Sequence, residues 1–319
     1  MKTVKSWCAL SAIVLSLSAN LSTHATIYNI SDASQTPPNK IISGDTLNLT
    51  GTGSTNFNFY SLGESTVNIN GGTLNSFADS FGTSTVNLFS GEILNSFQSH
   101  DTSVVNVTGG IVRATANPLN HSTFNVSGNA IVERLNANGS STVNLSGGTT
   151  TEITAYDTST LNISDIAVIT EATSVAGTIN ITGGEITDSL TASWGGIVNI
   201  SGGTINRIIA QDTGILNFIG SNFTINEILL DNLSNASAIL SNLTSTLTAP
   251  AVINDRDVIF SGILADGTPF SYNLSSVNDH TNSFFSPNAI INIVPVPEPT
   301  SLALLTLPLL LISRKRPRS

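Results

Sequence analysis

The chain has 319 residues, of which 40% are hydrophobic and 10% charged, and its 21 acidic residues outnumber the 11 lysines and arginines. Helix-favouring Lys, Glu and Gln are scarce among abundant Ser, Thr, Asn, Gly, Ile and Val, so we expect a β-rich, turn-rich fold. The acidic excess argues against nucleic acid and anionic lipid surfaces as partners.

The N-terminus is typical of a secretory signal peptide. Lys2 and Lys5 precede the apolar run "WCALSAIVLSL", which is too short to span a bilayer, and small residues follow up to Ala25. We predict a signal peptide over residues 1–25, recognised by the Sec export machinery and cleaved after Ala25, with Ala19 as the fallback. The only cysteine, Cys8, leaves with it, so the exported chain has no disulfide.

The body consists of one repeated motif. "STVNINGG" returns as "STVNLFSG", "SVVNVTGG", "STVNLSGG" and similar segments. Its central asparagine recurs at steps of 18 to 20 residues, at Asn48, Asn68, Asn87, Asn106, Asn125, Asn144, Asn162, Asn180, Asn199 and Asn217. Each unit has an alternating segment, usually a Gly-Gly pair, and a second alternating segment, which indicates strand, corner, strand, corner.

This period predicts an all-β parallel β-solenoid of about ten coils, each 18 to 20 residues long. We favour a right-handed coil, because parallel crossovers are almost always right-handed. The left-handed hexapeptide solenoid needs a strict six-residue period, and an antiparallel sandwich would not repeat one consensus, so both are less favoured.

The alternation assigns a side to each residue. One internal ladder is expected from Val67, Val86, Val105, Phe124, Val143, Leu161, Ile179, Val198 and Leu216. A polar outer face is expected around Asn68, Asn87, Asn106, Asn125, Asn144, Asn162, Asn180 and Asn199. Six of these asparagines, from Asn106 to Asn199, also lie in N-x-[ST] sequons, but we favour hydrogen-bonded side-chain ladders over glycosylation because the repeat itself spells that motif.

Corner residues stand five positions before most markers. Gly, Asn and Asp tolerate the left-handed conformation, and they occur there at Gly63, Gly82, Asp101, Asn120, Gly139, Asp157 and Asp212. Val175 and Trp194 depart from this rule. We assign residues 26–235 to the solenoid with an N-terminal cap, and residues 236–294 to a C-terminal cap with a hairpin at Asp266-Gly267.

Catalytic, cofactor and metal signals are thin, and we predict no such site. His24, His100, His121 and His280 lack ligand spacing, although His100 and His121 fit neighbouring coils as solvated corner residues. The corner acids Asp101, Asp157 and Asp212 are not on adjacent coils and are interpreted as turn formers. No carboxylate or basic cluster on adjacent coils was evident.

The C-terminal segment, residues 295–319, has three parts. Val296, Pro297, Glu298 and Pro299 precede a largely apolar stretch over residues 301–312, and a basic cluster of Arg314, Lys315, Arg316 and Arg318 follows. As a helix this stretch is shorter than a bilayer core, so we expect a weak, temporary stop in the inner membrane with the basic end inside.

This layout resembles the PEP-CTERM sorting domain of bacterial surface proteins. The resemblance implies an exopolysaccharide-producing Gram-negative bacterium and a membrane-embedded exosortase that cuts near Pro-Glu-Pro. We therefore expect an exported chain, anchored transiently in the inner membrane and then located at the cell surface or outside it.

For the body we expect a non-enzymatic structural or adhesive role, with exopolysaccharide as a possible ligand. The alternatives are a polysaccharide-processing β-helix enzyme and an ice- or crystal-binding solenoid.

Overall fold

A parallel β-solenoid of about ten turns forms the body of the protein. The computed structural model describes residues 24–55, 58–75, 78–230, 251–279 and 281–296, and these contain no helix. The predicted all-β parallel β-solenoid of about ten coils is therefore confirmed for this part of the chain. Most of the predicted signal peptide and all of the sorting segment after Val296, with its expected helix, lie outside the described residues.

Each coil has a straight strand on one side and a bent second side, which is one longer strand in most coils and separate short strands near the N-terminus. The straight strand of one coil is β14 (Thr142–Leu145), followed by a glycine corner and by β15 (Thr149–Tyr156). Neighbouring coils pair in parallel and in register, so that Asn144 of β14 lies opposite Asn125 of β12. Register shifts within the second strand, for example between Val112 and Thr115, mark the bend.

The other strands follow the same plan. The straight side contains β1 (Ile27–Ile30), β3 (Thr46–Thr50), β10 (Val104–Val107), β12 (Thr123–Val126) and β16 (Thr160–Ile163). The bent side contains β2 (Lys40–Ile41), β4 (Ser54–Thr55), β5 (Phe59–Ser61), β7 (Ala78–Ser80), β9 (Phe97–Ser99), β11 (Ile111–Pro118), β13 (Ile131–Ala137) and β17 (Val168–Val175). Strands that continue through the glycine corner are β6 (Thr66–Leu74), β8 (Thr85–Ile93), β18 (Thr178–Ser193), β19 (Ile197–Ala210) and β20 (Ile215–Ile225).

The interior is filled by the side chains that the alternation pointed inward. Val143 and Leu161 have no exposed surface, and Phe124 is only 1% exposed. The rest of the predicted ladder is buried as well, and each member lies opposite the next across a parallel pair. The predicted strand parity is therefore confirmed.

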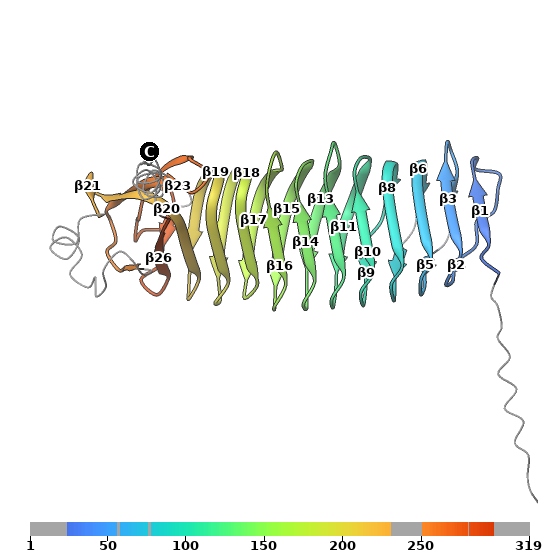
Figure 1. The fold of residues 1–319 in the computed structure, drawn as a ribbon, viewed down its shortest axis with the longest axis horizontal. Helices are drawn as coiled ribbons and strands as arrows, with labels where there is room; N and C mark the ends of the chain where they lie inside the picture. The colour runs from blue at the N-terminus through green and yellow to red at the C-terminus, as the bar shows by residue number, and fades with distance from the viewer. Residues whose placement is uncertain (1–23, 56–57, 76–77, 231–250, 280, 297–319) are drawn as a thin grey trace, which may run out of the picture.

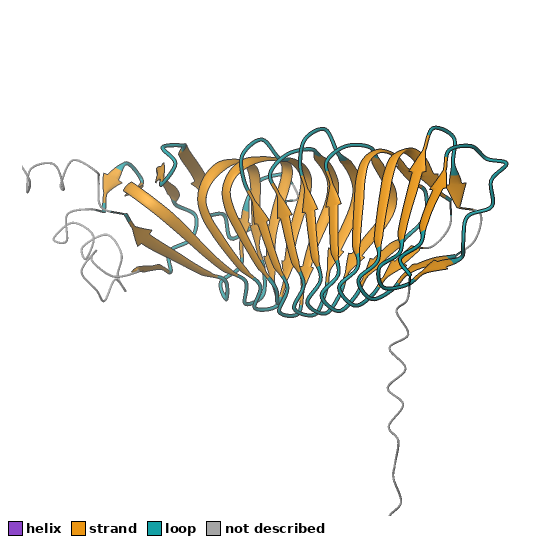
Figure 2. Cartoon of the chain, turned by 45° about the vertical axis from the view of Figure 1, so that its right-hand side comes forward, coloured by secondary structure: helices purple, strands orange, loops and turns teal. Residues whose placement is uncertain are grey.

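The loops and turns between strands line up along the upper and lower edges of the stack (Figure 2). All seven predicted corner residues have positive φ, from 53° at Asp212 to 69° at Gly82. Trp194 keeps the same conformation with φ 51°, although it is neither Gly, Asn nor Asp. The exception at Val175 has a physical reason: four steps separate Tyr156 from Thr160, but only three separate their partners Val175 and Thr178. This shorter corner transfers the left-handed position to Ala176, with φ 63°.

At both ends of the stack, a further parallel strand lies beyond the ten units that the repeat predicted. At the N-terminal end, β1 pairs in parallel with β3 and places Asn29 opposite Asn48. At the opposite end, β26 (Ile290–Pro295) pairs in parallel with β20 and places Asn292 opposite Asn217 (Figure 1). Residues predicted to belong to the cap regions thus extend the solenoid itself.

The remaining C-terminal strands surround the last coils. They are β21 (Ile228–Leu229), β22 (Ala251–Ile253), β23 (Ile259–Leu264), β24 (Pro269–Asn273) and β25 (Phe284–Phe285). β23 and β24 form an antiparallel pair around Asp266-Gly267, where the sequence predicted a hairpin, and β23 also pairs with β20. Phe270 of this hairpin stacks on Phe218 of the solenoid with ring centroids 5.1 Å apart, which joins the hairpin to the core.

Candidate functional site

A continuous ladder of asparagine side chains runs along the straight side of the solenoid. Nδ2 of each asparagine donates to Oδ1 of the asparagine on the neighbouring coil, at 2.6 to 3.0 Å. The ladder comprises Asn29, Asn48, Asn68, Asn87, Asn106, Asn125, Asn144, Asn162, Asn180, Asn199, Asn217 and Asn292. All eight asparagines predicted to form a polar face belong to it.

The ladder uses only part of each amide. A side-chain amide has two N–H donors and two acceptor lone pairs, and each interior rung uses one of each. The asparagines from Asn68 to Asn217 are half-buried, so the remaining N–H and lone pair can reach the surface. The ladder therefore both joins the coils and leaves a regular row of hydrogen-bonding groups.

Two further rows flank the ladder. Thr123 stands on one side of Asn125 and Ser127 on the other, and the coils of Asn48, Asn144, Asn162 and Asn180 also have a Ser or Thr on both sides of the asparagine. The Ser/Thr row bonds in part to backbone, since the hydroxyl of Ser201 donates to the carbonyl of Ile181 at 3.1 Å. Five of the twelve positions in the threonine row are aliphatic: Ile27, Val104, Ile197, Ile215 and Ile290.

A second surface lies at the bend of the second strand, and we call it the charged strip. It consists of Glu92, Arg113, Glu133, Arg134, Glu152, Glu171, Glu185, Asp188 and Arg207. Three ion pairs join neighbouring coils along it: Arg113–Glu92 at 2.7 Å, Arg134–Glu152 at 2.8 Å and Arg207–Asp188 at 3.3 Å. The hydrogen bond from Arg113 lowers the pKa of Glu92 below its ordinary value.

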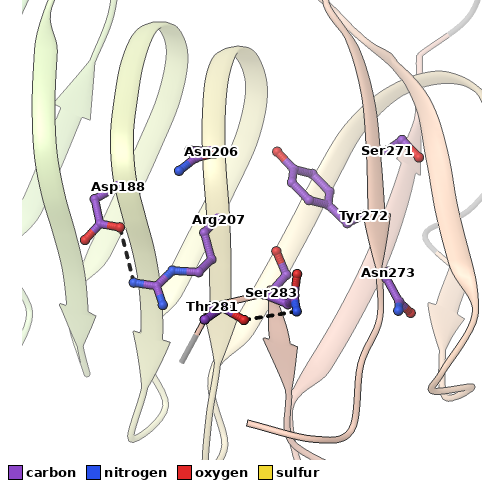
Figure 3. Close-up of a pocket in the computed structure, with 9 residues that line it drawn as sticks. Asp188, Asn206, Arg207, Ser271, Tyr272, Asn273, Thr281 and Ser283 are labelled. Carbon is purple, nitrogen blue, oxygen red and sulfur yellow. Dashed lines mark hydrogen bonds and ion pairs between the residues drawn. The ribbon is translucent and has the colours of Figure 1, made fainter. Parts of the chain in front are cut away.

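These pairs were not predicted from the sequence, in which only the acids at equivalent corners stood out. The signal was present, since the partners are 21, 18 and 19 residues apart, which is close to one coil. A surface depression of about 600 Å³ lies on the strip between Arg113, Glu133, Arg134 and Glu152. A second, of about 360 Å³, lies at the C-terminal end of the strip beside Asp188 and Arg207 (Figure 3).

Two of the three predicted turn-forming aspartates, Asp101 and Asp157, have hydrogen-bond partners on the neighbouring coil. The carboxylate of Asp101 accepts a hydrogen bond from the Gly82 amide at 3.0 Å, and that of Asp157 accepts one from Gly139 at 3.2 Å. His100 stacks on Phe81 of the neighbouring coil, with ring centroids 4.3 Å apart. Among the described residues, no group of three or more His, Cys, Asp or Glu side chains could hold a metal ion.

The sorting residues are described only at their edge. Ala25 is exposed, and the amide of Val296 donates to the carbonyl of Gly220 at 2.7 Å. Pro297, Glu298, Pro299, Arg314, Lys315, Arg316 and Arg318 lie outside the described residues. Within the part of the chain that is described, no helix is long and apolar enough to cross a membrane.

No family model, curated protein or solved structure matches the chain. The function must therefore be inferred from the asparagine ladder with its flanking rows, from the charged strip, and from the predicted signal peptide and sorting segment.

Proposed function

We propose that this protein is an exported, non-enzymatic rod of the cell surface or extracellular matrix, with a structural or adhesive role and an affinity for extracellular polysaccharide. The observation that carries the proposal is the three-row face, which on the successive coils of Asn125, Asn144, Asn162 and Asn180 places a hydroxyl side chain on each side of the asparagine. The signal peptide and the sorting segment supply export, exosortase recognition and a transient inner-membrane anchor.

The geometry of the face suits an extended, hydroxyl-rich polymer. Adjacent strands are about 4.8 Å apart, so donors and acceptors recur at that interval along the rod. The ladder already holds each amide in place, so little side-chain entropy is lost when a ligand binds. Each contact is weak, but many contacts on one polymer add through multivalency.

Co-sedimentation of the full-length chain with its host's exopolysaccharide tests the proposal. Because the asparagines join the coils, the sharper variant replaces Thr85, Thr123, Thr142 and Thr160 with Val. These threonines make no side-chain hydrogen bond within the described residues, so valine removes a row of hydroxyls and leaves the ladder intact. Co-sedimentation should fall, whereas Asn117→Ala and Asn136→Ala on the bent side should leave it unchanged. Equal binding by the threonine variant and the unaltered chain would refute the role of this face.

One observation favours a second candidate, a polysaccharide-processing enzyme. Asp188 and Arg207 lie on neighbouring coils and line the same depression, and such an enzyme needs a carboxylate and a base on adjacent coils. Release of reducing ends or unsaturated sugars from the host polysaccharide, lost in Asp188→Asn, would support it. The ice-binding alternative is less favoured, because aliphatic residues interrupt the threonine row.

A further inference from the structure

The charged strip ends in a groove where the solenoid meets the C-terminal hairpin. β19 forms its floor through Asn206 and Arg207, and β24 forms the facing wall through Ser271, Tyr272 and Asn273 (Figure 3). Besides the depression of about 360 Å³, two others, of about 260 and 350 Å³, adjoin it, and Asn206 lines all three. Asn206 is therefore the centre of an extended groove.

The wall of this groove is held to the floor by direct bonds. The hydroxyl of Tyr272 donates to the backbone carbonyl of Ile205 at 3.0 Å. The amide of Ile208 donates to the hydroxyl of Ser283 at 3.1 Å, and the amide of Gly203 donates to the carboxylate of Asp266 at 2.8 Å. These contacts fix the wall against the floor, so little conformational entropy is lost when a ligand binds between them.

The lining chemistry selects the class of ligand. Amides come from Asn206, Asn273 and Asn282, and hydroxyls from Ser271, Thr281 and Ser283. The two charged groups of the central depression, Asp188 and Arg207, neutralise each other at 3.3 Å. Such a surface offers many donors and acceptors but no net charge, which matches the alternating hydroxyl and ether groups of an uncharged sugar.

Size and charge support the same class. A volume of about 360 Å³ lies within the range of small-molecule sites, about 300 to 1,000 Å³. Glu185 adds a negative charge beside the neighbouring depression, so a polyanionic ligand is disfavoured. The ring of Tyr272, fixed by its hydroxyl and stacked on Phe270 with centroids 5.8 Å apart, adds aromatic surface at the wall.

We propose that this groove, centred on Asn206, binds a short segment of a neutral glycan. The inference rests on the proposed association with polysaccharide and deepens it: the threonine–asparagine–serine face gives many weak contacts along the rod, and the groove gives one defined site at its C-terminal end.

Isothermal titration of the full-length chain with cellohexaose, isomaltohexaose and mannohexaose tests the groove, with tetragalacturonate as the polyanionic comparison. We expect at least one neutral hexasaccharide to bind with an affinity that changes little between about 50 mM and about 500 mM NaCl. Asn206→Ala should raise its Kd about tenfold or more. Asn206 is exposed and makes no side-chain hydrogen bond within the described residues, so folding should be preserved.

The matched control is Asn136→Ala, which removes an outward amide from a bent strand outside the groove and should leave Kd unchanged. Binding of tetragalacturonate alone, binding of none of the neutral sugars, or equal Kd for Asn206→Ala and the unaltered chain would each overturn the proposal. If Asn206→Ala loses hexasaccharide binding but still co-sediments with the polysaccharide, the groove and the threonine–asparagine–serine face are two independent binding sites. Hexasaccharide binding that persists without any co-sedimentation would instead refute the proposed function and leave the groove standing.

Discussion

Asn144 donates a hydrogen bond from Nδ2 to Oδ1 of Asn125 at 2.8 Å, and its own Oδ1 accepts one from Asn162 at 2.8 Å. Each interior asparagine thus donates to the coil before it and accepts from the coil after it, so all side-chain amides of the ladder have the same orientation along the stack. A residue that can only accept breaks this order.

Asn144→Asp tests that order. The carboxylate lacks the N–H that Asn125 accepts and places oxygen against oxygen at hydrogen-bond distance, so we expect a loss of about 1 to 3 kcal/mol in the free energy of unfolding near neutral pH. Protonation of the introduced carboxylate at low pH restores a donor and should recover part of the lost free energy of unfolding. Thermal unfolding at two pH values measures both effects. Asn136→Asp, whose side chain has no partner within the described residues, should be close to neutral; equal losses at both positions would contradict a structural role for the ladder.

Val143→Asp examines the core one residue earlier. Val143 has no exposed surface and lies between Phe124 and Leu161, so an unpaired carboxylate there should cost several kcal/mol or force its own protonation. Its matched control is Thr142→Asp, on the outward side of the same strand. We expect a much larger fall in thermal midpoint for Val143→Asp, and similar midpoints would argue against the assigned parity.

Trp194 holds a strained corner conformation. Its φ is 51° and it is 69% exposed. Asn120 occupies the equivalent corner of another coil, so Trp194→Asn should relieve strain with little loss of packing. We expect a gain of about 1 kcal/mol, seen as a higher thermal midpoint. Ile166→Asn removes a similarly exposed apolar side chain (76%) without a positive φ and serves as the control. A lower midpoint for Trp194→Asn would show that the indole makes a favourable contact.

Burial raises the pKa of Tyr272 to about 12, from an ordinary value of 10.0. The unfolded chain then releases this proton at lower pH than the folded chain, so the stabilising contribution is complete below pH 10.0 and is lost as pH rises toward about 12. Unfolding midpoints across that window should fall more steeply for the unaltered chain than for Tyr272→Phe. Parallel curves would show that Tyr272 ionises as freely in the folded chain as in the unfolded one.

The sorting prediction concerns residues outside the described part. Deletion of residues 301–319 should release the body from the inner membrane, because this apolar and basic segment is the predicted stop signal. Fractionation of cells expressing each form measures it. A chain in which only Arg314, Lys315, Arg316 and Arg318 become Gln keeps the apolar stretch and should be retained less than the unaltered chain but more than the truncated one. Retention of the truncated form would place the anchor elsewhere.

The fold of the body could be predicted because each coil of a solenoid contacts only its neighbours, so the same residue types recur in the sequence once per coil. The marker asparagines, the inward ladder from Val67 to Leu216 and the left-handed corners all follow from an 18- to 20-residue step and two-residue alternation. The two-residue period assigns faces without any knowledge of distant contacts.

Other features depend on contacts that no local period records. Asn292 reaches the ladder only because a strand 75 residues beyond Asn217 buries Ile291 and Ile293 on the open edge of β20. The ion pairs of the charged strip depend on where the second strand bends, since bulges and corners of different length change the spacing of partners between 18 and 21 residues. The groove at Asn206 likewise depends on distant contacts. Its floor comes from the repeat, and its wall comes from a hairpin that folds back across the last coils.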